Sequence, residues 1–224
     1  MSLQSKLDAF KADFEAGKPP YNVPPAVIAT MRRATAELIA SGVAQHARKA
    51  GDRAPAFTLD APDGTQVSSA DLLRRGPLVT TFYRGVWCPY CNMELQALQD
   101  VLPDIEAAGA SLVAISPQLP VNSRKSVRQN ALTFPILSDP HNDVGAAFGL
   151  RFALPDYLIA LYKSLRNDLP AFNGDPSWTL PMPARYVIAP DGTIVYAEVN
   201  PDYTHRPEPS EMLPAIRKAA AGAR

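Results

Sequence analysis

The sequence predicts an α/β protein with a central mixed β-sheet flanked by helices on both faces and a helical extension at its N-terminus. Three observations predict this class. Apolar side chains recur at helical spacing through the first fifty residues. From residue 51 the chain changes to short β-branched and aromatic runs bounded by turn residues, and helical segments alternate with these runs. We therefore expect two parts, a helical extension over 1–50 and an α/β domain over 51–224 with an insertion at about 140–182.

The N-terminal extension contains two predicted helices. Residues 3–16 place leucine and phenylalanine side chains three or four positions apart, and the breaker Gly-Lys-Pro-Pro follows at 17–20. A second helix is predicted from about 25 to 49, and Pro24-Pro25 would open it because proline fits the first turn of a helix. The apolar faces of both helices need a cover, either the rest of the chain or a second copy, and we expect a homodimer.

The domain after residue 51 alternates strand-like and helical segments. Leu78–Tyr83 reads LVTTFY, a β-branched and aromatic run, and Pro190-Asp191-Gly192 is a turn between two strand-like segments. The connection over 140–183 is too long for a bare loop, so helices are expected within it at 142–149 and 158–167. The remaining expected elements are strands at 56–59, 111–116, 185–189 and 193–198 and helices at 92–108, 123–130 and 212–220.

The composition excludes several classes of function. The 22 Lys and Arg residues balance 22 Asp and Glu residues, so the net charge of zero predicts no nucleic-acid partner and no membrane partner. No window approaches the roughly 18 apolar residues of a membrane span. The first 17 residues hold no apolar run of signal-peptide type, so we expect a cytoplasmic protein. The chain has no glycine-rich phosphate loop, which predicts that no nucleotide or flavin cofactor is bound.

The chain has two cysteines, Cys88 and Cys91, between a predicted strand and a predicted helix. With three dispersed histidines they cannot supply four zinc ligands, so no metal is expected unless a second subunit completes the site. Cys88 lies at the positive end of the helix, where a thiolate is favoured. Cys91 follows one turn later on the same face, within reach for a disulfide. This predicts a nucleophile and its redox partner, and the alternative is two small core residues.

The segment Trp87-Cys88-Pro89-Tyr90-Cys91 resembles the redox motif of thioredoxin-fold proteins, and its Pro-Tyr centre resembles that of glutaredoxins. A wider frame resembles the peroxiredoxins of the alkyl hydroperoxide reductase and thiol-specific antioxidant (AhpC/TSA) group. The segments that carry this resemblance lie at 51–59, 63–64, 82–84, 134–139 and 186–192. The resemblance covers about residues 51–220, and it implies a thioredoxin-like, peroxiredoxin-type sheet.

The chain departs from typical peroxiredoxins beside its first cysteine. Typical members carry Pro and Thr seven and three positions before the peroxidatic cysteine, where this chain has Thr81 and Gly85. The turn from Tyr83 to Cys88 is shortened to thioredoxin length. The chain therefore resembles the peroxiredoxin-like subgroup with the pattern FYRGxWCPYC.

Four neighbours of the cysteines are candidate site residues. Arg84, four positions before the first cysteine, is expected to stabilise its thiolate or to orient a peroxide. Glu94, three positions after the second cysteine, is either a proton shuttle for that thiol or a solvated helix carboxylate. Trp87 and Tyr90 are expected to shape the mouth of the substrate site.

Two further candidates lie before and within a late strand. In thioredoxin-like folds a cis proline faces the redox motif, and Pro183 stands at the matching place, where the alternative is an ordinary trans proline. Many peroxiredoxins hold a peroxide-binding arginine there, whereas in this chain Arg185 follows two residues later. Because residues two apart on a strand share a face, Arg185 either approaches Cys88 or is a solvated strand residue. Trp178, in the insertion, is expected to pack in the core.

The resemblance implies an antioxidant thiol peroxidase. Cys88 would attack a hydroperoxide and become a sulfenic acid, Cys91 would condense with it to a disulfide, and a thioredoxin- or glutaredoxin-type reductant would restore both thiols. Two alternatives remain open. One is a thiol–disulfide oxidoreductase that acts on protein disulfides, and the other is a non-enzymatic redox sensor whose disulfide changes how the N-terminal helices dock.

Overall fold

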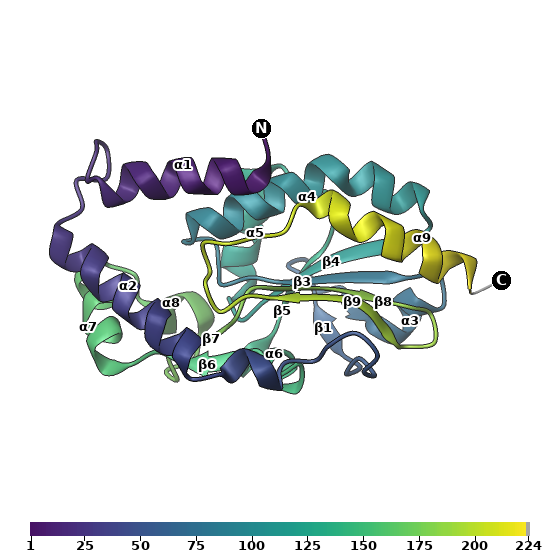
Figure 1. Ribbon diagram of the computed structural model, residues 1–224. Helices are drawn as coiled ribbons and strands as arrows, with labels where there is room; N and C mark the ends of the chain where they lie inside the picture. The colour runs from purple at the N-terminus through teal and green to yellow at the C-terminus, as the bar shows by residue number, and fades with distance from the viewer. Residues whose placement is uncertain (223–224) are drawn as a thin grey trace.

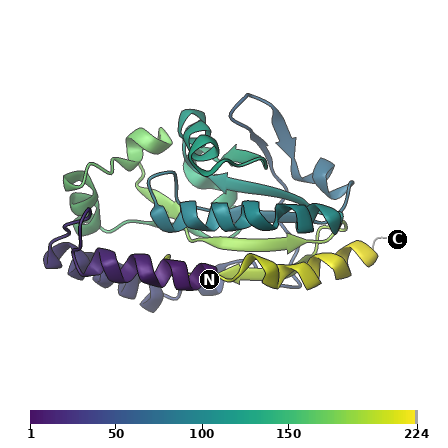
Figure 2. The ribbon, with the colours of Figure 1, turned by 90° about the horizontal axis from the view of Figure 1, so that it is seen from above.

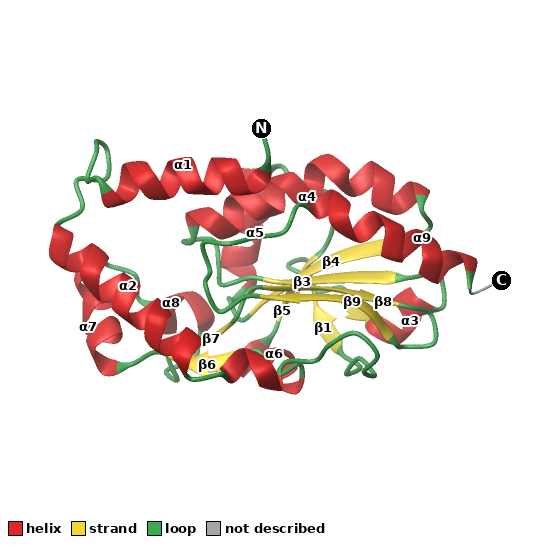
Figure 3. Cartoon of the chain, in the orientation of Figure 1, coloured by secondary structure: helices red, strands yellow, loops and turns green. Residues whose placement is uncertain are grey.

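The computed structural model describes residues 1–222, which form a central β-sheet with helices over both faces (Figures 1 and 3). The helices are α1 (Leu3–Glu15), α2 (Pro25–Ala40), α3 (Ser69–Leu73), α4 (Pro89–Ala107), α5 (Pro120–Asn130), α6 (Asp143–Ala147), α7 (Asp156–Ser164), α8 (Leu169–Asn173) and α9 (Leu213–Ala221). Short 3₁₀ helices lie at η1 (Val43–His46), η2 (Pro140–Asn142) and η3 (Pro209–Met212). Within residues 1–222, no helix combines the length and the apolar character needed to cross a membrane.

The main sheet is mixed, as the sequence predicted. Its strands follow the order β2-β1-β5-β4-β3-β8-β9. Strands β3, β4 and β5 pair in parallel, and the others pair antiparallel. The strands are β1 (Thr58–Asp60), β2 (Gln66–Ser68), β3 (Leu78–Phe82), β4 (Ser111–Ser116), β5 (Ile136–Ser138), β8 (Ala184–Ile188) and β9 (Ile194–Val199), and a separate hairpin pairs β6 (Arg151–Ala153) with β7 (Thr179–Pro181).

Alternation along the strands divides the core into two layers. Val79 of β3 faces α4 and α9, whereas its neighbours Leu78 and Phe82 face the opposite layer with Phe148. Figure 1 shows α1, α4 and α9 above the sheet and α6 below it. Helices α4 and α5 connect the parallel strands, because a parallel crossover needs a helix to return the chain to the same edge. The site therefore lies where β3 ends and α4 begins.

Most predicted elements are confirmed within a few residues, and one is wrong in extent. The second N-terminal helix ends at Ala40 and not near residue 49. Ser41 caps it, and Gly42 then takes a left-handed backbone with φ of +69°, which ends the α-helix and leads into the separate turn η1. The expected strand at 56–59 forms as β1, which begins two residues later.

Helix α1 lies along α4 and is covered by its own chain. Figure 2 shows α1 and α9 end to end beside α4 over the same face of the sheet. Leu3 and Leu7 are buried in the core layer that α4 shares with the sheet, and the Phe10 ring meets the Tyr90 ring edge-on at 5.1 Å. The apolar face of α1 therefore does not depend on a second copy for burial.

The insertion forms a small layer of its own. Helix α7 packs against α2, and the β6–β7 hairpin closes the layer. Trp178 is buried there with Leu158 and Tyr162, which confirms the expectation of core packing for this tryptophan. The layer brings Tyr162 toward the end of β3.

Candidate active site

Cys88 occupies the N-cap of α4. The turn that begins after β3 ends there, and Pro89 takes the first position of the helix, where its missing N–H needs no partner. The Cys88 backbone N–H donates to Gly85 O at 3.1 Å, which closes the turn. Cys91 follows one helical turn later. Both cysteines are free thiols, and Cys88 is only 1% exposed.

A buried amide holds the turn in front of Cys88. Gln118, just after β4, accepts from the Val86 N–H at 2.9 Å and donates to Tyr83 Oη at 2.6 Å. Serine hydroxyls of α5 complete this buried polar cluster. The sequence analysis missed Gln118, because a single glutamine after a strand carries no local pattern. Its role is positional, since it fixes the backbone from which Cys88 projects.

Gly85 explains one departure from the usual peroxiredoxin pattern. Its φ is +146°, and a Cβ at this position would lie 2.5 Å from Trp87 Nε1. A threonine therefore cannot stand here in this turn. Thr81, at the other departing position, donates its hydroxyl to Ala184 O at 3.3 Å within the sheet. In this chain the positive charges near Cys88 are those of Arg84 and Arg206.

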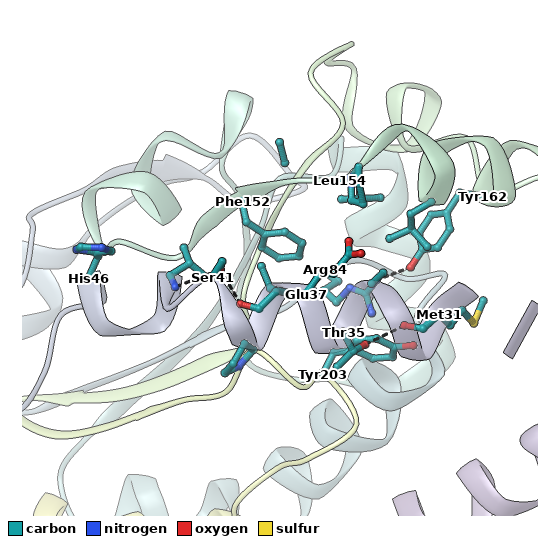
Figure 4. Close-up of a pocket in the computed structure, with 17 residues that line it drawn as sticks. Met31, Thr35, Glu37, Ser41, His46, Arg84, Phe152, Leu154, Tyr162 and Tyr203 are labelled. Atoms are coloured by element: carbon teal, nitrogen blue, oxygen red, sulfur yellow. Dashed lines mark hydrogen bonds between the residues drawn. The ribbon is translucent and has the colours of Figure 1, made fainter. Parts of the chain in front are cut away.

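Arg84 is a buried cation enclosed by aromatic rings. Its Nη2 donates to Tyr162 Oη at 2.5 Å (Figure 4). Its guanidinium carbon lies 4.1 Å from the centre of the Tyr203 ring and 4.9 Å from the centre of the Trp87 ring. Burial alone lowers the pKa of Arg84, but Tyr162 and Cys88 outweigh it and raise the pKa above its usual value. Arg84 thus remains charged beside the thiol.

Glu94 and Arg185 form a buried ion pair, so the solvated alternatives for both residues were wrong. Arg185 Nη2 donates to Glu94 Oε1 at 2.7 Å, and both side chains are almost completely buried. The other carboxylate oxygen accepts from Arg206 Nε at 2.6 Å. A buried carboxylate needs such partners, because an unpaired charge in the interior is very costly. Arg185 thus contacts the carboxylate of α4, and no hydrogen bond joins it to Cys88 among residues 1–222.

Arg206 is a second site residue that was not predicted from the sequence. It lies in a polar loop after β9, and its Nη2 approaches Cys91 Sγ at 3.9 Å. No spacing or motif in the sequence distinguishes it from a surface arginine. Its contact with Cys91 spans 115 positions of the chain, so only folding brings the two together.

The two thiols are pushed in opposite directions. Burial raises the pKa of Cys88, but a hydrogen bond from the Cys91 thiol and the charges of Arg84 and Arg206 outweigh it and lower the pKa to about 6. Burial and the neighbouring Cys88 raise the pKa of Cys91 well above its usual value. At pH 7 the thiolate form of Cys88 is therefore favoured, whereas Cys91 remains a thiol.

The expected cis bond at Pro183 was wrong. Among residues 1–222 the cis bond is Pro19–Pro20, so Met182–Pro183 is trans. The chain runs extended from β7 into β8, and the Met182 N–H donates to Leu150 O at 2.9 Å, which leaves no tight turn at this point. Ala184 pairs with Phe82, so Pro183 lies at the end of the sheet from which the Cys88 turn begins.

A groove of about 630 Å³ opens on Cys88. Trp87 and Tyr90 line it together with Cys88, and helices α1 and α2 also line it, through side chains such as Phe10, Phe14 and Met31. A second cavity of about 660 Å³ lies between α2 and the insertion, and Arg84, Tyr162 and Tyr203 line both (Figure 4). The groove that contains Cys88 is therefore lined by aromatic rings and by the Arg84 cation.

The model of the AhpC/TSA family matches residues 50–197 of this chain. The chain belongs to the AhpC/TSA family. Putative peroxiredoxin Rv2521 of Mycobacterium tuberculosis is 41% identical over 99 residues, which is 44% of this chain and 62% of that protein. Peroxiredoxin Bcp of Escherichia coli is 33% identical over 102 residues, 46% of this chain and 65% of that protein. The alignments thus span less than two thirds of these AhpC/TSA relatives.

Solved structures confirm the thioredoxin-like, peroxiredoxin-type fold of this AhpC/TSA chain. Peroxidoxin BcpB of Mycobacterium tuberculosis superposes with a TM-score of 0.59 and 21% identity over 79% of this chain and 98% of its own. Peroxiredoxin 6 of Arenicola marina superposes with a TM-score of 0.61 and 18% sequence identity, and the match covers 79% of this chain and 76% of that chain. The AhpC/TSA match begins after α1 and α2 and ends before Tyr203 and Arg206. Part of the groove wall and one of the site's cations thus lie outside the matched region.

Among residues 1–222, no three His, Cys, Asp or Glu side chains are grouped as a metal site would require. The site of this AhpC/TSA chain consists of a thiolate, a second thiol and two guanidinium groups. A thiolate can attack an electrophilic oxygen or sulfur, and the adjacent cations can hold the negative charge that leaves it.

Proposed function

We propose that the protein is a thiol peroxidase that reduces a hydroperoxide with Cys88 and resolves the product with Cys91. The observation that carries this proposal is the buried Cys88 at the start of α4, in a groove that the Arg84 guanidinium also lines, where the surrounding charges lower the pKa of the thiol to about 6. A small hydroperoxide can enter such a groove. Membership in the AhpC/TSA family supports the same chemistry.

In the first step the Cys88 thiolate attacks the outer oxygen of the hydroperoxide. The S–O bond forms as the O–O bond breaks, the thiolate becomes a sulfenic acid, and the alkoxide leaves as an alcohol after taking up a proton. We infer that Arg84, which lines the same groove as Cys88, stabilises the charge that moves onto the leaving oxygen. Trp87 and Tyr90 line the groove beside Cys88.

In the second step Cys91 condenses with the sulfenic acid. The S–S bond forms, the S–O bond breaks, and the departing hydroxide takes the Cys91 proton as water. We propose that a thioredoxin- or glutaredoxin-type dithiol then reduces the disulfide. We infer that Glu94 supports this step by holding Arg206 in position, and that Arg185 acts through Glu94.

A thiol–disulfide oxidoreductase is the second candidate, and the Trp-Cys-Pro-Tyr-Cys segment at a helix start favours it. Its substrate would be a protein disulfide, which must reach the attacking sulfur directly. Cys88 is 1% exposed in a groove that Trp87 and Tyr90 also line, so its burial favours a small substrate.

The experiment that separates these candidates is stopped-flow oxidation of the reduced protein by hydrogen peroxide and by an organic hydroperoxide. Tryptophan fluorescence reports the reaction, because Trp87 adjoins Cys88. We expect rates far above those of a free thiol at the same thiolate fraction, and none in Cys88→Ser. Rates equal to those of the free thiol, together with fast exchange with a protein disulfide, would establish the second candidate. A redox sensor without turnover would consume a single equivalent of hydroperoxide even with excess thioredoxin and its reductase.

We also propose a cytoplasmic location, because the cycle needs a compartment that supplies dithiol reductants. A homodimer remains a prediction. Ile39 on α2 is 51% exposed and Leu165 beyond α7 is 42% exposed, and these side chains are available for a second copy. Sedimentation of the full chain tests this, and Ile39→Glu should shift any dimer toward the monomer.

A further inference from the structure

The loop from Asn200 to Glu208, here called the 200–208 loop, supplies two side chains that contact the site. Tyr203 stacks on Arg84 with 4.1 Å between the guanidinium carbon and the ring centre. Arg206 reaches deeper, with Nε on Glu94 at 2.6 Å and Nη2 on Cys91 Sγ at 3.9 Å. Arg206 thus bridges the carboxylate anchor and the second thiol.

Both cations of the site act on both sulfurs, but the larger effect falls on a different sulfur for each cation. Burial and the neighbouring Cys88 raise the pKa of Cys91, and Arg206 is the strongest of the charges that oppose this rise. For Cys88 the strongest opposing charge is Arg84. Arg206 is buried and remains charged because Glu94 compensates for its burial. The geometry agrees, since Arg206 Nη2 lies 3.9 Å from Cys91 Sγ.

Helix α1 fixes the 200–208 loop in this position. Gln4 uses both ends of its amide, because its Nε2 donates to Thr204 O at 3.3 Å and its Oε1 accepts from the Arg206 N–H at 2.9 Å. Lys11 donates to Thr204 Oγ1 at 3.1 Å, and Glu208 accepts from the Leu3 N–H at the start of the helix. The N-terminal helix therefore hydrogen-bonds to the backbone of Arg206, whose side chain contacts Cys91.

We propose that Arg206 is a catalytic residue of the resolving step, where it stabilises the Cys91 thiolate, and that Gln4 of α1 is its positioning residue. The inference rests on the proposed function, since it concerns the second half of the same cycle. It gives the N-terminal helix a part in the chemistry although that helix lies outside the family match.

Arg206 would act both when the disulfide forms and when it is reduced. When the sulfenic acid of Cys88 is resolved, Cys91 must lose its proton to attack, and that proton leaves with the hydroxide as water. When an external thiolate attacks the Cys88 sulfur of the disulfide, Cys91 leaves as a thiolate, and its electron pair comes to rest beside Arg206. In both steps the negative charge forms on the sulfur that Arg206 contacts.

Loss of the Arg206 charge should lower the thiolate fraction of Cys91 at pH 7 much more than that of Cys88. If Arg206→Met raises the pKa of each cysteine by one unit, the thiolate fraction of Cys88 at pH 7 falls from about 90% to about 50%, less than twofold. Cys91 titrates far above pH 7, so its thiolate fraction falls about tenfold for the same change. The variant should therefore slow resolution much more than oxidation.

The test uses the full chain in Arg206→Met, Arg206→Lys and Gln4→Leu, with Lys6→Ala as the control on an exposed position of α1. Stopped-flow fluorescence follows oxidation and then disulfide formation, and a dione reagent traps the sulfenic acid. Arg206→Met should slow disulfide formation about tenfold at pH 7, accumulate trapped sulfenic acid and displace the pH profile of resolution upward. Arg206→Lys should restore part of the rate, Gln4→Leu should lose severalfold, and Lys6→Ala should match the parent chain.

The proposal is overturned if resolution keeps its rate and pH profile in Arg206→Met, or if Arg206→Met and Arg206→Lys lose the rate equally at every pH. If Arg206→Met does not fold, the pH profiles of resolution in Gln4→Leu and Arg206→Lys test the proposal in its place.

A second measurement needs no hydroperoxide. The disulfide is formed with oxidised glutathione and reduced by dithiothreitol, and Arg206→Met should slow this reduction. If the parent chain fails to react with hydroperoxides, the proposed function falls, while this reduction still tests Arg206.

Discussion

Acidification is expected to show how the fold activates Cys88. Burial raises the pKa of this thiol, but the Cys91 hydrogen bond and two arginines outweigh burial and set the pKa at about 6. The thiolate is the form that attacks, so the rate of oxidation by a hydroperoxide should fall as pH decreases through 6. The half-maximal rate should occur near that pH.

The magnitude follows from the fraction ionised. With a pKa of about 6, the thiolate fraction is about 90% at pH 7 and about 9% at pH 5, a tenfold loss. A thiol with the ordinary value of 9.0 would be about 1% ionised at pH 7 and would lose about a hundredfold over the same interval. The two cases differ in both the midpoint and the slope of the profile.

The assay combines the pH profile of the oxidation rate with the ultraviolet absorbance of the thiolate in the reduced protein. Cys88→Ser should remove the absorbance change between pH 5 and pH 7. Cys91→Ala should move the midpoint upward, because it removes the hydrogen bond that favours the thiolate. A midpoint above pH 8 in the parent chain, or no movement in Cys91→Ala, would refute the reasoning.

Three further predictions concern stability. Gly85→Ala should lower the free energy of unfolding by about 1–3 kcal/mol, because its Cβ would meet the Trp87 indole; Gly64→Ala, also at positive φ but with open space, should cost less in the same urea titration. Leu7→Ala should cost about 2–5 kcal/mol, since Leu7 is fully buried under α4, and a loss below 0.5 kcal/mol would show that α1 is not part of the core. The reduced chain should grow more stable from pH 6 to pH 9, because the folded pKa of Cys88 lies below its unfolded value and the unfolded chain binds more protons in that window; the contribution is lost as pH falls through 6, and a matching dependence in Cys88→Ser would contradict it.

Local patterns in the sequence predicted the frame of the site well. The run Leu78–Tyr83 predicted a strand, and the proline after Cys88 predicted the start of a helix. Both predictions hold because strand propensity and the first helical turn depend on neighbouring residues. The spacing of the cysteines placed one sulfur a helical turn from the other. The same local logic was wrong at residues 41–49, where Ser41 and Gly42 end the second helix.

Long-range pairings were beyond the sequence. Glu94 could be read as solvated or as a proton carrier, and in the folded chain it holds Arg185 and Arg206 in a buried network. Pro183 matched the position of a cis proline, but the path of the chain from β7 to β8 keeps its bond trans. Neither outcome depends on the residues beside these positions.

The sequence by itself determined the spacing of the two cysteine sulfurs, the strand and helix that present them and the family frame around them, because these depend on interactions within a few residues. The tertiary structure decided which charges surround the sulfurs. Arg206 comes from 115 positions beyond Cys91, and Gln4 from 202 positions before Arg206. An arginine in a polar loop has the same local pattern whether it ends in water or against a thiol, and only the packing of α1 and the 200–208 loop distinguishes the two.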